Sequence, residues 1–199
     1  DAYQLGIAAT VLYLGAVGDR YGRKRMLLLG AFLCVPFSLM SAWSPTAVFL
    51  IGAQIAVGVS GGMLYPTTLS MITALWRGKK LTAAIALWTG IGTGASVLGP
   101  ILGGWLLGNY WWGSVFLITV PLAIVVLVLG FVVLPKSAAE HNEPVDHQGG
   151  TLSVIMISSL VLGIVMLPQG ITITVGVLFA VMLVSGFLFV RRERRAPNP

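Results

Sequence analysis

Charged residues are scarce in this sequence, with Asp, Glu, Lys and Arg together making up only 9% of it. A soluble domain carries about 25% charged residues. Hydrophobic residues reach 57% here, and the mean hydropathy is +0.94. The lack of charge therefore excludes a soluble domain and predicts an integral membrane protein.

Other absences narrow the class of protein further. The single cysteine, Cys34, lies in an apolar run and leaves no internal disulfide to form. No basic segment precedes the first apolar run, so no signal peptide is visible, and the missing initiating Met suggests a fragment. The apolar runs hold no histidine and no interior acid. This argues against an intramembrane enzyme, which needs Ser, His, Asp or a metal cluster within the spans.

Uncharged stretches set the number of predicted membrane helices. A spanning helix needs roughly 20 apolar residues, with about 17 as the lower limit. The four uncharged stretches leave room for one, two, two and two spans; they are 2–18, 26–76, 81–135 and 147–190. We therefore predict an all-α fold with seven spans, at roughly 2–17, 26–43, 47–75, 81–107, 113–134, 151–168 and 171–190.

The basic residues alternate with the predicted spans. All 12 Lys and Arg residues lie in or beside the connectors after the first, third, fifth and seventh spans. The positive-inside rule predicts that these connectors face the cytoplasm. The net charge of +6 thus reflects topology and predicts no nucleic-acid partner. Tryptophan and tyrosine gather at the opposite interface, as an aromatic belt does, namely Trp43, Trp105, Tyr110, Trp111 and Trp112.

Residues 15–25 form a charged connection between the first two predicted spans. Gly18 and Gly22 can adopt positive φ and reverse the chain there. Asp19 lies at the C-terminal end of a helix, where the dipole disfavours an anion, so it should need a cationic partner. The candidate partners are Arg20, Arg23, Lys24 and Arg25.

This connection resembles the signature loop of the major facilitator superfamily, G-x-x-x-D-R-x-G-R-K/R. The positions in register are Gly15, Asp19, Arg20, Gly22, Arg23 and Lys24. The resemblance implies that the loop gates the cytoplasmic side against a second lobe. A simpler interpretation, a basic turn that only sets topology, does not account for six matches at fixed spacing.

A glycine-rich run in the fourth predicted span provides a second resemblance. Gly99, Pro100, Gly103 and Gly104 match the motif G-x-x-x-G-P-x-x-G-G of proton-driven drug exporters in this superfamily, with Ala95 in place of the first glycine. The run also contains Gly90 and Gly94. Ala95, Gly99 and Gly103 are four apart and share one face, which predicts close helix packing, and Pro100 predicts a bend. The motif implies antiport, although ordinary tight packing is the alternative.

Further similarity points to the fourteen-helix drug:proton antiporter branch. Residues 111–121 partly resemble its W-R-W-x-F-x-x-N-x-P segment, without the Arg and Asn. The loop 191–195 lacks the glycine and aspartate with which a twelve-helix carrier would repeat the signature. The chain would then run from the second to the eighth helix of the family. A degenerate repeat in a twelve-helix carrier is the alternative.

These resemblances imply four regions. Residues 1–134 form an N-terminal lobe without its first helix, 135–150 a cytoplasmic linker, 151–190 two extra central spans and 191–199 a cytoplasmic tail. The linker holds three acids and both histidines. Because Pro, Gly and Ser interrupt it without recurrent ligand spacing, we expect a solvated linker and no metal site.

Four residues are candidates for the substrate or proton pathway. Trp88 lies about 12 Å into its span and could stack on a lipophilic cation, as could Tyr65; helix packing is an equal alternative for both. Gln54 stands where the family motif R-x-x-x-G carries Arg, with Gly58 in register. Asp1 matches the D-x-Y-x-L opening of the second helix in multidrug members, although it could simply begin a helix.

The resemblance implies a proton-coupled exporter of drugs or other lipophilic cations, working by alternating access in the bacterial cytoplasmic membrane. Its expected partners are a small-molecule substrate, protons, membrane lipids and the second lobe of the same protein, with no cofactor. A facilitator or uptake symporter on the same fold, or an exporter of lipids or metabolites, is the alternative. A scaffold without transport would leave the signature loop unexplained.

Overall fold

The computed structural model describes residues 2–134, 146–170 and 172–194, and within these ranges all regular structure is helical. The elements are α1 (Ala2–Tyr21), α2 (Arg23–Ala42), α3 (Ala47–Leu75), α4 (Lys79–Asn109), α5 (Ser114–Leu117), α6 (Thr119–Val133), α7 (His147–Met166), the 3-10 helix η1 (Leu167–Gln169) and α8 (Ile173–Glu193). The predicted all-α fold is confirmed.

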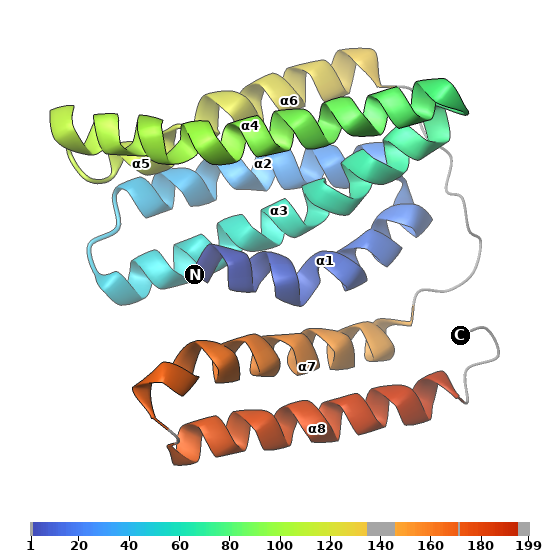
Figure 1. Cartoon of the computed structure of the whole chain (residues 1–199), viewed down its shortest axis with the longest axis vertical. Helices are drawn as coiled ribbons and strands as arrows, with labels where there is room; N and C mark the ends of the chain where they lie inside the picture. Colours follow the sequence, from blue (N-terminus) through green and yellow to red (C-terminus); the bar gives the residue numbers. More distant parts are fainter. Residues whose placement is uncertain (1, 135–145, 171, 195–199) are drawn as a thin grey trace.

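The long helices lie roughly parallel or antiparallel to one another (Figure 1). Helices α1 to α6 form one group, in which α3 packs between α1 and α2, and α2 packs against α6. Helices α7 and α8 pair with each other, and α7 joins the group through α1. Lys24, Lys79 and Arg192 all lie at the same end of the long helices, which we call the basic end.

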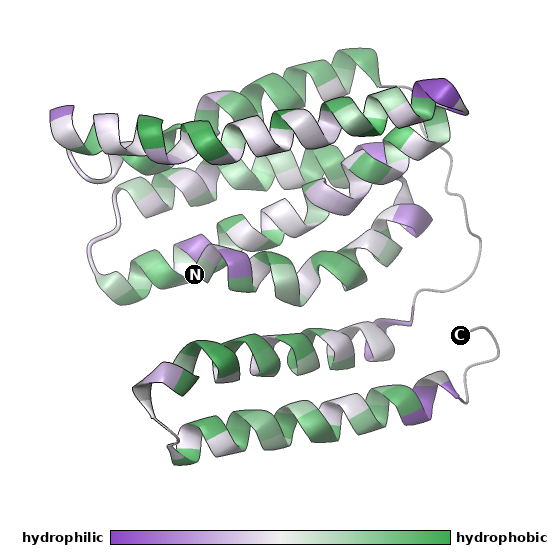
Figure 2. Cartoon of the chain, viewed as in Figure 1, coloured by the Kyte–Doolittle hydropathy of each residue, from purple (hydrophilic) through white to green (hydrophobic). Residues whose placement is uncertain are grey.

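Six of the described helical segments are long and apolar enough to cross a membrane. They comprise α2, α3, α4, the joined α5–α6, α7 and α8. Helix α1 has 20 residues but is not among them, because Gln4, Asp19 and Arg20 lower its hydropathy. The first predicted span is therefore present as a helix, α1, although it falls outside the set of strongly apolar segments; Figure 2 shows polar residues toward both of its ends.

The predicted boundaries differ from the observed ones in detail. The span predicted over 113–134 is present as Ser114–Val133, with a one-residue interruption at Ile118 between α5 and α6. Helix α7 begins at His147, four residues before the predicted position, so the end of the expected linker is helical. Asp146 is the reason, since its carboxylate accepts hydrogen bonds from the first backbone N–H groups of the helix. The rest of that linker, 135–145, and the tail residues 195–199 lie outside the described residues.

Among the described helices, α1 and α3 cross with their backbones in close approach. A Cβ atom added to Gly58 would lie 2.2 Å from the carbonyl oxygen of Tyr3 and 2.9 Å from Cα of Gly6. A Cβ atom added to Gly6 would lie 2.4 Å from the carbonyl oxygen of Ile55. Only glycine allows two helix backbones to approach this closely. The pair Gly6 and Gly58 therefore fixes where α1 crosses α3.

Candidate functional site

The charged connection between α1 and α2 is mostly helical. Helix α1 continues to Tyr21 and α2 begins at Arg23, which leaves Gly22 alone between them, with φ 107°. Its N–H donates to the carbonyl oxygen of Gly18 at 3.0 Å. The expectation of positive φ holds for Gly22 but was wrong for Gly18, which is a buried helical residue of α1. Gly22 thus makes the whole reversal, because it lacks the Cβ atom that positive φ disfavours.

Arg23 connects three helices at this reversal. Its Nε lies 3.0 Å from Oδ1 of Asp19, and its Nη1 donates to the carbonyl oxygen of Ser70 on α3 at 2.9 Å. The side chain of Arg23 is only 13% exposed. The predicted cationic partner of Asp19 is therefore present, and it is Arg23. The planar guanidinium group can reach both acceptors at once because its N–H groups point in several fixed directions.

Lys24 and the remaining loop residues make separate contacts. Lys24 Nζ donates to the carbonyl oxygens of Phe131 at 2.9 Å and Leu134 at 2.5 Å, so it caps the C-terminal end of α6. Arg20 lies 5.4 Å from the ring centre of Tyr21. Arg25 is exposed. Gly15 packs near Pro66 of α3, and a Cβ atom added to Gly15 would lie 3.4 Å from Cβ of Pro66.

A second polar cluster joins α7 to α8 at the basic end. Asp146 accepts hydrogen bonds from the backbone N–H groups of Gln148 at 3.1 Å and Gly149 at 3.0 Å. Its other oxygen lies 2.7 Å from Nε of Arg192, whose Nη1 also donates to the side chain of Gln148. The hydrogen bond from Arg192, followed by those from the backbone, lowers the pKa of Asp146. Asp146 therefore remains an anion at neutral pH and holds Arg192.

Helix α7 also contacts α1 beside this cluster. The hydroxyl oxygen of Tyr13 lies 2.8 Å from Nδ1 of His147. A Cβ atom added to Gly150 would lie 2.0 Å from the Tyr13 ring, so this approach requires glycine. The sequence reasoning missed this contact because its partners are 134 positions apart. The start of α7 did have a signal in the sequence, because Asp146 stands immediately before it and aspartate is a preferred N-cap residue.

The glycine-rich face of α4 is open. On the face shared by Ala95, Gly99 and Gly103, a Cβ atom added to Gly99 would meet no atom within 4 Å, and one added to Gly103 would meet only Val115, at 3.8 Å. Gly90, Gly94 and Gly104 lie on other sides of α4, and added Cβ atoms there would also meet nothing within 4 Å. The expected close packing of this face is therefore absent among the described residues. It occurs instead at Gly6 and Gly58 of α1 and α3. Pro100 lies inside α4, and the bend expected there stays a prediction.

The structure brings together two of the predicted pathway residues. The rings of Tyr65 on α3 and Trp88 on α4 lie 5.2 Å apart, with planes inclined by 56°. Tyr65 is 56% exposed. Gln54 is half-buried and precedes Tyr65 by 11 residues, which places it about 16 Å away along the helix. Asp1 lies outside the described residues. The aromatic pair is therefore separate from Gln54.

A metal centre finds no support in the described part of the chain, which holds no group of three or more His, Cys, Asp and Glu side chains that could bind an ion. The polar groups instead join helix ends. What the arrangement offers a ligand is an aromatic pair beside the open face of α4.

Comparison with known proteins decides the family. Residues 2–197 match the model of a protein family described as "Major Facilitator Superfamily". This chain belongs to that superfamily. It is therefore a multi-pass membrane protein of a transporter family and not an enzyme, and the resemblance to this superfamily is confirmed.

The superfamily relatives include several drug exporters. The chain is 39% identical, over its whole length, to the multidrug efflux pump LfrA of Mycolicibacterium smegmatis, of which it covers 40%. It is 38% identical over 81% of its length to the methyl viologen resistance protein SmvA of Salmonella typhimurium, covering 33% of that protein. It is 30% identical over its whole length to the tetracenomycin C resistance and export protein of Streptomyces glaucescens, covering 38%. The chain thus spans about two fifths or less of these relatives.

Proposed function

We propose that the full-length protein exports lipophilic cations from the cell by proton-coupled antiport. The sequence similarity to proteins named for multidrug efflux and for methyl viologen resistance supports this proposal. Methyl viologen is a flat aromatic dication, the type of molecule that aromatic rings attract through their electron-rich faces. We further propose that the whole protein has the fourteen-helix architecture, with α7 and α8 as its extra central pair.

The observation that carries the proposal is the Tyr65–Trp88 pair. The two rings come from different helices and lie 5.2 Å apart, and Tyr65 is largely exposed. Trp88 follows the start of α4 by nine residues, which places it roughly 14 Å inside the span. At this depth a cation is desolvated and its attraction to an aromatic face reaches about 2 kcal/mol. We assign the pair to cargo binding.

The open face of α4 supports alternating access. Transporters of this kind move two lobes against each other around a central site. The glycines on α4 leave space for another helix backbone to approach. We propose that this face moves against the second lobe and that Asp19 and Arg23 stabilise the closed state at the basic end. An uptake symporter would carry its cargo inward and would not need the glycine-rich antiporter motif.

Proton coupling requires an ionisable group whose pKa changes with burial or with cargo. Within the described spans the carboxylates lie at helix ends, as Asp19 does, and Gln54 cannot titrate. We propose that Asp1 assists in proton or cation handling and that the principal acid lies outside this sequence.

The aromatic pair can be tested in the full-length protein. Tyr65→Ala with Trp88→Ala should lower methyl viologen transport roughly tenfold, because two cation–π contacts are removed. Transport of an uncharged lipophilic compound should fall much less. Trp105→Ala is the matched control, since Trp105 lies on the same helix but pairs with Tyr110 near its other end.

Transport is measured in inside-out vesicles with an imposed pH gradient, after correction for protein abundance. Accumulation of methyl viologen driven by an acidic interior supports export. Normal transport by the double variant would remove the pair from the site. Loss of preloaded cargo instead of accumulation would favour the uptake alternative.

A further inference from the structure

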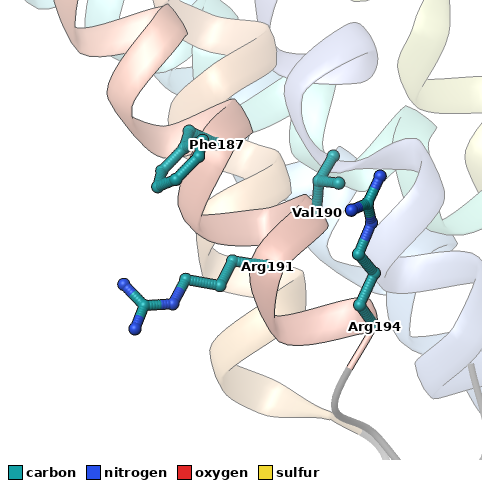
Figure 3. Close-up of a pocket in the computed structure, with 4 residues that line it drawn as sticks. All are labelled: Phe187, Val190, Arg191 and Arg194. Carbon is teal, nitrogen blue, oxygen red and sulfur yellow. The ribbon is translucent and has the colours of Figure 1, made fainter.

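The basic end of α8 carries a cavity that the transport proposal does not use. It has a volume of about 360 Å³ and is lined by Phe187, Val190, Arg191 and Arg194 (Figure 3). These positions follow the spacing i, i+3, i+4 and i+7, which places them on one face of a helix. Along this face, two apolar side chains within the span are followed by two cations at its end.

Arg191 and Arg194, which line the cavity, differ from Arg192 in their side-chain contacts. Arg192 is held by Asp146 and Gln148 at the start of α7. Arg191 and Arg194 are exposed, and neither has an ion-pair partner among the side chains that the structure describes. Figure 3 shows Arg191 extending from the helix on the side of Phe187, and Arg194 lying on the other side, beside Val190. Both guanidinium groups are therefore available to an anion.

Within the part of the chain that the structure describes, the apolar part of this face is also exposed. Phe187 is 67% exposed and Val190 is 49% exposed. Leu183 and Val184, one turn further into the span, are 66% and 60% exposed. A ligand that fits this surface must combine apolar chains with a negatively charged group at the membrane boundary. Free phosphate carries the charge but leaves the apolar surface uncovered.

We propose that this cavity binds an anionic phospholipid. Both exposed arginine side chains turn toward one head group, and their guanidinium groups hold the phosphate oxygens, for which a planar fork of N–H donors is well suited. The acyl chains lie along Phe187 and Val190 toward Leu183 and Val184. Basic clusters at the end of a spanning helix attract anionic lipid head groups. Topology alone requires positive charge at this end, but it does not require two cations on the face that carries Phe187.

Native mass spectrometry of the full-length protein tests this site. The protein is purified in mild detergent and titrated with phosphatidylglycerol or with zwitterionic phosphatidylethanolamine. Arg191→Gln with Arg194→Gln should weaken phosphatidylglycerol binding by about tenfold, because each cation contributes to attraction of an anionic head group. Phosphatidylethanolamine binding should change little. Arg77→Gln with Lys79→Gln is the matched control, since it removes two charges from the basic end outside the cavity.

Further measurements distinguish a phospholipid site from a site for a free anion. Phe187→Ala should also weaken phosphatidylglycerol binding, and millimolar inorganic phosphate should not displace the lipid. If the double variant does not accumulate, Arg191→Gln alone takes its place. The proposal is overturned if phosphatidylglycerol binds the arginine variant as it binds wild type, or if the control weakens binding equally. Displacement by inorganic phosphate would also overturn it, by indicating a free-anion site.

Discussion

Arg23 makes the charged turn part of the helix packing, because one guanidinium group binds Asp19 on α1 and the Ser70 carbonyl on α3. Asp19→Asn removes the anion but leaves the bond to Ser70 in place. We expect this variant to reach the membrane in normal amounts and to lose export, because the proposed gate loses its ion pair. Arg25→Gln, at an exposed position, should leave export near the wild-type rate.

Export and membrane abundance are measured on the same cells expressing the full-length protein. Wild-type export by Asp19→Asn would show that the charged turn serves topology alone. A loss of membrane abundance in step with export would make Asp19 a folding residue instead of a gating one.

The crossing of α1 and α3 should make the stability of the helix packing sensitive to substitution of its glycines. Gly58→Ala places a Cβ atom 2.2 Å from the Tyr3 carbonyl oxygen, and such overpacking costs about 1–3 kcal/mol or more. Gly52→Ala lies on the same helix where a Cβ atom meets nothing within 4 Å. It should be neutral or stabilising by up to about 1 kcal/mol, because alanine favours helix over glycine.

Thermal unfolding of the purified full-length variants distinguishes the two glycines. We expect a lower melting temperature for Gly58→Ala and an equal or higher one for Gly52→Ala. Equal melting temperatures for both variants would mean that α1 and α3 do not cross where the structure places them.

The orientation of the whole molecule stays a prediction from the distribution of positive charge. Exposed Lys79 and Asn109 lie at opposite ends of α4. In a Cys34→Ala background, an impermeant thiol reagent added to intact cells should label Asn109→Cys and spare Lys79→Cys, because basic loops face the cytoplasm. The background change is small, since Cys34 is buried among apolar residues. Labelling of Lys79→Cys but not of Asn109→Cys would show that the protein has the opposite orientation.

Sequence alone determined the features that depend on composition and local chemistry. Uncharged stretches longer than about 17 residues can satisfy lipid only as spans, so the helix order was predictable. The ion pair of Asp19 was also predictable, because an anion at a helix C-terminus needs a nearby cation. The start of α7 was missed, although Asp146 is an N-cap residue that a stricter reading of capping would have used.

Only the tertiary structure decided which glycines bring helices together. Helices α3 and α4 each carry glycines four residues apart, at Gly58 and Gly62 and at Gly99 and Gly103. Yet a Cβ atom added to Gly58 would touch the α1 backbone, while one added to Gly99 would meet nothing within 4 Å. The difference depends on which helix lies opposite, and spacing within one helix does not contain that information. The same holds for Tyr65 with Trp88, and for Tyr13 with His147. These pairs come from separate helices, so their contact is set by how the helices pack and not by the local sequence of either.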